Sequence, residues 1–242
     1  GGRGHNTVLD AACFLVKNKE LKGFLQMRPH IMGHICNIPD IQWKNMGQDI
    51  RAAGDPAHYI DPEILGYTPK TLPLDLDKLK KDFANKPNKM EEGKKITSVV
   101  RQLGSLYWRV DQMMGNLTDL KSDFAKAKPP QDRKEEQDND SLFNKTTYAF
   151  MINAGILGHY VGDTGQPYHN TADHDGWYSG HGGIHGYYEE DLVAEIDGDL
   201  ISKILKKARA MNHPDWLKGT YPERMQKMSM VSFEDIKKIE KL

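Results

Sequence analysis

Two pairs of a histidine and a carboxylate share the same four-residue spacing between residues 159 and 189. His159 and Asp163 form the first pair, His185 and Glu189 form the second, and His169 lies between them. Residues four apart lie on one face of a helix, one turn above the other, so each pair can bind one metal ion from a single helix. Imidazole nitrogen and carboxylate oxygen are the usual non-thiolate ligands of zinc. The spacing therefore predicts a zinc centre.

Three further candidate ligands lie beside glycine, proline or acidic residues, where the backbone can bend a side chain inward. They are His5 in GGRGH, Asp40 in NIPDIQW and His58 in GDPAHYIDPE. Taken singly, each would more often be a surface or capping residue. His159 and Asp163 carry more weight, because burying both without partners on an apolar helix face is costly. The presence of the whole set in one chain predicts a metal cluster.

Helical periodicity dominates the chain, so we expect one all-α domain that spans residues 1–242. The central helix is expected over 142–163, where Ile156, His159 and Asp163 follow at steps of three and four. Residues 37–73 are rich in Pro, Gly and Asp and are expected to form a long ordered loop. The charged segment 126–140 is expected to be a mobile loop. The first helix is expected to begin near Asn6. The other expected helices cover 19–35 (broken at Pro29), 74–85, 96–114, 184–196, 200–211 and 233–242.

The composition is typical of a soluble globular protein. The chain has 242 residues, of which 28% are charged and 38% hydrophobic, and its net charge is −1. This charge gives no global field that favours nucleic acid or an anionic membrane. No apolar stretch is long enough to span a bilayer, so we expect no stable membrane insertion. We also expect a monomer. Cys13 and Cys36 are either two buried free thiols or one bridge between neighbouring helices, and they are too few to bind the zinc.

The start of the chain at GGRGH is typical of a processed or trimmed N-terminus. One interpretation is the mature form of an exported protein, which would be secreted or periplasmic. The other is the remnant of a cleaved tag.

The motifs HYVGDTGQPYH and GIHGYYEEDL resemble those of the zinc-dependent phospholipase C family, which shares a superfamily with the zinc-dependent single-strand nucleases. The resemblance covers the N-terminal GxxGH, the HYIDPE segment and the block from His159 to Leu192. It implies an all-helical fold of the phospholipase C and single-strand nuclease type, built around three clustered zinc ions. It also implies hydrolysis of a phosphodiester.

The resemblance further implies three sets of ligands. Asp40, His58, His159 and Asp163 would bind the first zinc; His169, His185 and Glu189 would bind the second; His5, a bridging Asp163 and the amine and carbonyl of Gly1 would bind the third. The family usually begins with a tryptophan before the glycines, and this sequence has none there. The expected content is therefore two to three zinc ions.

The predicted chemistry is attack by a zinc-activated water molecule on a phosphodiester. Asp40 is the catalytic candidate, because a carboxylate at the edge of the cluster could orient or deprotonate that water. Asp163 could bridge two ions through its two oxygens. No serine or cysteine nucleophile with a partnered base is needed or evident.

Phospholipid and nucleic acid are the competing substrates. The Tyr in HYVGD and the choice of Glu189 rather than Asp favour the phospholipase branch, and Trp43 stands where related nucleases tend to have an arginine. Tyr59 and Trp177 are candidate substrate contacts, able to stack on bases or pack against lipid. His174 is expected on the rim of the cleft, as a third candidate substrate contact. The non-enzymatic alternative is a zinc-stabilised helical domain that binds a partner.

Four histidines are expected to lie outside the cluster. His181 could compete with His185, but only His185 forms a histidine–carboxylate pair. His30, His34 and His213 are expected to be structural or surface residues.

Overall fold

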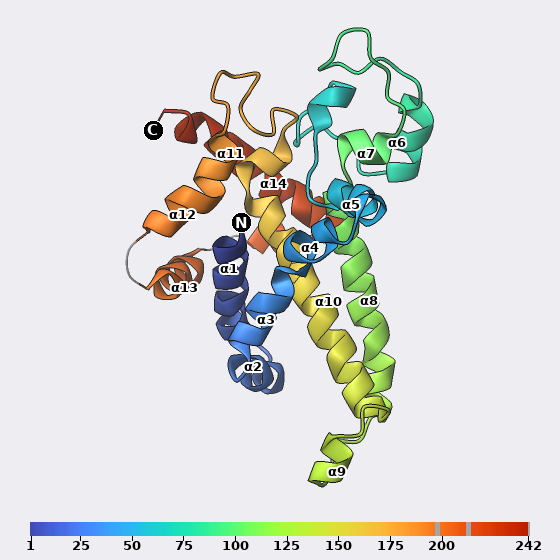
Figure 1. The fold of residues 1–242 in the computed structure, drawn as a ribbon, viewed down its shortest axis with the longest axis vertical. Coiled ribbons are helices and arrows are strands. Elements are labelled where there is room, and N and C mark those ends of the chain that lie inside the picture. The colour runs from blue at the N-terminus through green and yellow to red at the C-terminus, as the bar shows by residue number, and fades with distance from the viewer. Residues whose placement is uncertain (197–198, 212–213, 242) are drawn as a thin grey trace.

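The computed structural model describes residues 1–196, 199–211 and 214–241 (Figure 1). Every element within these ranges is helical, and β structure there is limited to two isolated bridges, Ile60–Gly104 and Pro87–Lys95. The prediction of an all-α protein is confirmed. Within the described residues, no helix combines the length and the apolar character needed to cross a membrane.

The longest helices pair at the centre of the molecule. α8 (Leu106–Lys126) and α10 (Leu142–Gly165) pack along each other, and α9 (Arg133–Glu136) lies at the turn between them (Figure 1). α10 also packs against α1 (Gly2–Leu15), α3 (Pro29–Cys36) and α14 (Tyr221–Ile239). The remaining α-helices are α2 (Lys19–Gln26), α4 (Ile38–Ile41), α5 (Gln48–Gly54), α6 (Leu76–Phe83), α7 (Val99–Leu103), α11 (Ile184–Gly186), α12 (Leu192–Glu195) and α13 (Leu200–Ala210).

The predicted long loop over residues 37–73 is wrong in its first part. This segment forms α4 and α5 and the 3₁₀ turns Trp43–Asn45, Asp55–Ala57 and Pro62–Leu65. Proline stands at the first or second position of three of these pieces, where its fixed φ suits a helix and its missing N–H is not needed. At these positions proline favours the start of a short helix and does not prevent the helix from forming.

The predicted helix over 96–114 is two helices. α7 ends at Leu103, and Gly104 adopts a φ of 85° before α8 begins. A Cβ at Gly104 would overlap the carbonyl oxygen of Tyr59, so this position requires glycine.

Three other boundaries also differ from prediction. α1 begins at Gly2 rather than near Asn6. α9 forms inside the segment expected to be a loop, with Asp132 as its N-cap. The last helix begins at Tyr221 rather than at 233, because Thr220 and Glu223 form a capping box and Pro222 occupies the first turn.

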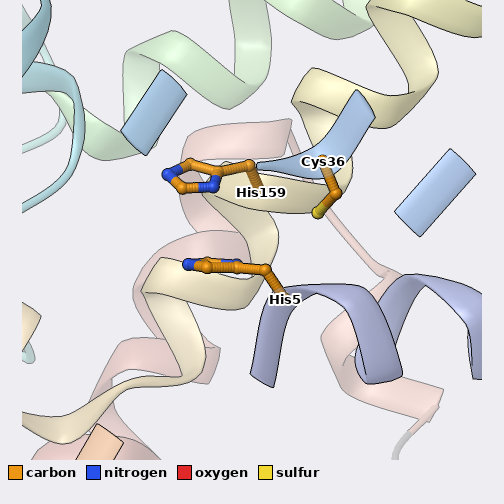
Figure 2. Close-up of side chains that lie close together, drawn as sticks. All are labelled: His5, Cys36 and His159. Carbon is orange, nitrogen blue, oxygen red and sulfur yellow. The ribbon is translucent and has the colours of Figure 1, made fainter. Parts of the chain in front are cut away.

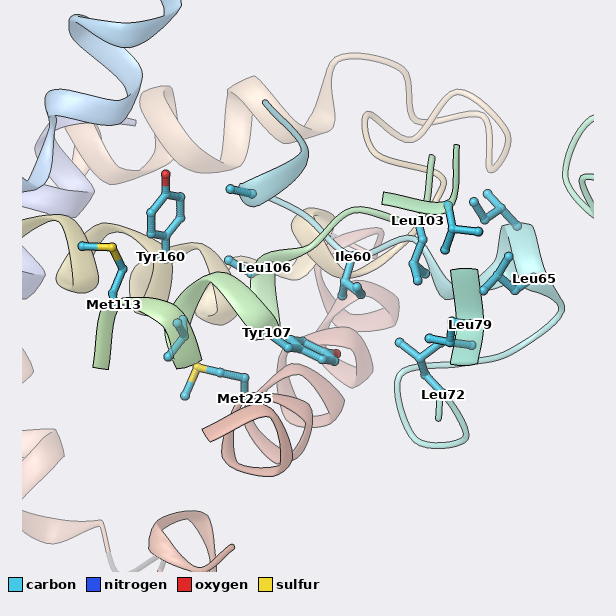
Figure 3. Close-up of a cluster of buried hydrophobic side chains, with 14 of the residues drawn as sticks. Ile60, Leu65, Leu72, Leu79, Leu103, Leu106, Tyr107, Met113, Tyr160 and Met225 are labelled. Carbon is cyan, nitrogen blue, oxygen red and sulfur yellow. The ribbon is translucent and has the colours of Figure 1, made fainter. Parts of the chain in front are cut away.

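Two apolar cores hold these helices together. The larger joins α6, α7, α8, α10 and α14, and includes the fully buried Tyr107 and Tyr160 (Figure 3). The smaller joins α1, α2 and α3 to α10 and contains Cys13 and Cys36, which are both buried free thiols. α10 contributes to both cores, so its polar face is held rigidly between them.

Candidate metal centre

α10 and α1 bring the first ligand candidates together. His159 and Asp163 lie one turn apart on α10, and their exposed fractions are 0% and 1%. Gly162 allows α1 to come close, because a Cβ there would lie 2.9 Å from Nδ1 of His5. The rings of His5 and His159 stack with centroids 4.0 Å apart. Two residues far apart in sequence therefore share one buried face.

Four donor atoms form the first group. Nδ1 of His58 lies 3.0 Å from Oδ2 of Asp163 and 3.0 Å from Nε2 of His159, which is itself 3.2 Å from the same Asp163 oxygen. Oδ1 of Asp40 lies 3.8 Å from both histidine nitrogens. Ligands of a tetrahedral zinc are about 3.3 Å apart at usual bond lengths. The spacing of these four atoms is close to that of ligands around one metal ion, and three of the four residues, Asp40, His58 and His159, form a group that could hold one.

The second group lies on the other side of Asp163. Nε2 of His185 is 3.1 Å from Nε2 of His169 and 2.7 Å from Oε2 of Glu189, and the last two atoms are 4.0 Å apart. Glu189 belongs to a π-helical turn, Tyr187–Asp191, inserted between α11 and α12. Such turns are often found at functional sites, because the extra residue redirects the side chains of the helix.

The third group joins the N-terminus to both of the others. Nε2 of His5 lies 3.2 Å from Oδ1 of Asp163 and 3.9 Å from Oε1 of Glu189, which contacts the amino nitrogen of Gly1. Nε2 of His5 and Oδ1 of Asp163 are buried and have no hydrogen-bond partner. A cation between them would satisfy both atoms.

Charge at the centre favours the forms that bind metal. Burial alone would raise the pKa of Asp163, but His159 and His169 outweigh it and hold this pKa well below its usual range. Burial alone would also raise the pKa of Asp40, but the neighbouring His159 and Lys44 outweigh it and lower this pKa to about 2. Burial and the neighbouring His169 lower the pKa of His185 to about 3. Ionised carboxylates and neutral imidazoles are the states that coordinate a metal.

Cys36 is a neighbour of the centre that the sequence did not assign to it. Its Sγ lies close to ring nitrogens of His5 and His159, and all three residues are buried (Figure 2). Burial raises the pKa of the Cys36 thiol well above its usual range, so the thiol keeps its proton. No local pattern in the sequence marks it, because Cys36 reaches the centre through the packing of α3 against α1 and α10.

His174 lies inside the second group and not only at its rim. Ligand atoms of His169, His174 and His185 all lie within 4.8 Å of one another. Its neighbours in the sequence form no regular helix, so no periodic spacing could place it there.

A pocket of about 360 Å³ opens over the centre. Lys44 and Arg51 line it together with Tyr59, and the sequence analysis assigned neither cation. Nζ of Lys44 donates to Oδ1 of Asp40 at 2.6 Å, and Nε of Arg51 donates to Oδ2 of Asp55 at 3.3 Å. The other lining residues are Gly1, Asp40, Asp55, His58, His169, His174, His185, Glu189 and Glu190.

The remaining candidates lie elsewhere. Trp177 is 73% exposed, does not line this pocket, and donates its indole N–H to Asp175. His181 faces Ser179 and Glu240, away from the donor atoms of the second group. His30 and His34 are exposed. His213 lies outside the described residues.

Comparison of the chain with known protein families, curated proteins and solved structures found no match.

Proposed function

We propose that this chain is a zinc-dependent phosphodiester hydrolase in which water is the nucleophile. The observation that carries the proposal is the position of Asp163. Its Oδ2 faces His58 and His159 while its Oδ1 faces His5, so one buried carboxylate can serve two ions. All nine ligand candidates named from the sequence lie within one connected network of short contacts, because His58 and His169 both contact Asp163: Gly1, His5, Asp40, His58, His159, Asp163, His169, His185 and Glu189.

Such a centre meets the two difficulties of phosphodiester hydrolysis. The substrate is anionic, and neutral water attacks it poorly. Bound zinc lowers the pKa of water and neutralises charge on phosphate oxygens. Asp40 stands at the edge of the pocket, and its low pKa suits it to accept a hydrogen bond from the attacking water and orient it, rather than to keep the proton.

With zinc bound, the pocket would suit an anionic ligand, whereas without it the carboxylates of Asp40, Asp55, Glu189 and Glu190 outnumber the two cations. Lys44 and Arg51 place positive charge beside the donor atoms, where a phosphate would lie. The residues that line the pocket include no serine or cysteine to act as a nucleophile. This lining favours direct attack by water over a covalent intermediate.

The substrate we propose first is a phospholipid, as the motifs of the second ligand group favour. A single-strand nuclease is the second candidate, and the pocket gives it specific support. Trp43 occupies the position at which related nucleases tend to have an arginine. Lys44 and Arg51 nevertheless supply cations in the pocket, and Tyr59 offers a ring on which a base could stack.

The test is hydrolysis of bis(p-nitrophenyl) phosphate by the zinc-loaded chain, followed by phosphatidylcholine, single-stranded DNA and RNA in parallel. We expect activity that a chelator removes and that added zinc restores. Unchanged turnover after complete removal of metal would contradict the proposal. Zinc binding without hydrolysis of any diester would favour the zinc-stabilised binding domain instead.

A further inference from the structure

His174 lies against two residues of the second ligand group. Its ring centroid is 4.4 Å from that of His185 and 5.5 Å from that of His169, whose plane is inclined to it by only 23°. The three residues each present a ring nitrogen within 4.8 Å of the others. If His174 had no role at the metal, its packing against these two imidazoles would need another explanation.

The loop that carries His174 is held in place on both sides. The carboxylate of Asp173 accepts hydrogen bonds from the backbone N–H groups of Tyr178 and Ser179, both at 2.9 Å. Oδ1 of Asp175 accepts from the backbone N–H of His185 at 3.2 Å. The Asp173 bonds close the loop on itself, and the Asp175 bond ties it to α11, which carries His185.

We propose that His174 is a fourth protein ligand of the second zinc, beside His169, His185 and Glu189. This inference rests on the proposed function only in requiring that zinc binds at this centre. Four protein donors fill the usual tetrahedral shell of zinc, as in structural sites. The second site would then have no position left for an exchangeable water.

The experiment measures zinc affinity rather than turnover. The full chain is loaded with zinc and titrated with a chromophoric chelator, alongside His174→Ala and the matched control His181→Ala. His181 lies in the same stretch, but it faces Ser179 and Glu240. We expect His174→Ala to weaken one equivalent of zinc by at least about tenfold, since even the loss of a ligand's supporting partner has that effect. His181→Ala is expected to match the wild type.

A second readout is independent of affinity. With cobalt in place of zinc, His174→Ala should change the visible absorption of one bound ion, because a nitrogen donor is lost. Circular dichroism checks that the variant keeps its helices. Equal affinity and an unchanged cobalt spectrum in a folded His174→Ala would overturn the inference and leave the proposed function standing. A wild-type chain that binds no zinc would overturn both.

Discussion

Nε2 of His5 on α1 and Oδ1 of Asp163 on α10 lie 3.2 Å apart, buried, and neither has a hydrogen-bond partner. Unpartnered polar atoms are rare in folded interiors because each one costs free energy. A pair of them facing each other, beside three further donor groups, is the arrangement that a bound cation would complete. Most of the following predictions test this relationship.

The first prediction concerns metal content and stability. We expect elemental analysis of the purified chain, expressed with ample zinc, to find two to three zinc ions per molecule. A chelator should lower the melting temperature, because metal that binds only the folded state stabilises it by about 2.7 kcal/mol at a hundred times its Kd. Absence of any transition metal would contradict the entire proposed centre.

The second prediction concerns Asp163. Asp163→Asn should abolish diester hydrolysis and release zinc while preserving helical content, because the amide cannot provide two anionic oxygens. The control is Asp111→Asn, at an exposed position of α8. Turnover equal to that of the wild type in Asp163→Asn would refute the bridging arrangement.

The third prediction compares two glycines in long helices. Gly162→Ala would place a Cβ 2.9 Å from Nδ1 of His5, so this ring must move and one zinc should be lost. Gly115→Ala on α8 meets no atom within 4 Å. It should leave zinc unchanged and raise the free energy of unfolding by roughly 0.5–1 kcal/mol, the usual gain of alanine over glycine in a helix. Zinc content and thermal unfolding, measured on both variants, test this prediction.

The fourth prediction concerns substrate charge. Arg51→Ala should raise KM for an anionic diester several-fold and leave kcat nearly unchanged, because Arg51 lines the pocket and contacts no ligand candidate. Steady-state kinetics on the zinc-loaded chain measure both constants. A fall in kcat with an unchanged KM would instead place Arg51 at the reacting atoms.

The fifth prediction concerns pH and a carboxyl remote from the ligands. Burial, with the nearby Glu63, raises the pKa of Asp61 well above its usual range, and its Oδ1 has no partner. A raised folded-state pKa means that the wild type loses stability as pH rises from the unfolded pKa towards the folded one. Asp61→Asn removes this loss, so it should melt at a higher temperature than the wild type at pH 7, with the difference vanishing near the unfolded pKa of about 3.9.

These melts are made with chelator present, so that loss of metal at low pH does not contribute. Asp140→Asn is the control, because the side chain of Asp140 is 91% exposed. A variant at Asp61 that is less stable at pH 7 would show that this carboxylate is needed in its charged form.

The parts of the centre that could be predicted are those set by local geometry. The pairs His159–Asp163 and His185–Glu189 follow from helical spacing alone, and the structure places each pair in contact. Cys36 reaches the centre only because α3 packs against α1 and α10. That packing depends on contacts distant in sequence, which no local pattern contains.

The fold shows the same division. Helical periodicity predicted α6, α10 and the break at Pro29, where apolar spacing and proline act within one or two turns. It missed the short helices before residue 73, because pieces of three to seven residues are too short to show a period. It also missed the division at Gly104, which is set by the carbonyl of Tyr59, a residue far away in sequence.

The contact between the amino nitrogen of Gly1 and Glu189 spans 188 residues, and that between His58 and Asp163 spans 105. Closing such long loops costs chain entropy before any contact compensates it. We therefore expect the donor atoms to meet after the helices between them have docked, and the centre to be among the last parts of the chain to form. On this expectation, a molecule with its full complement of ions has finished folding, and an incompletely folded copy would be recognised by the metal it lacks.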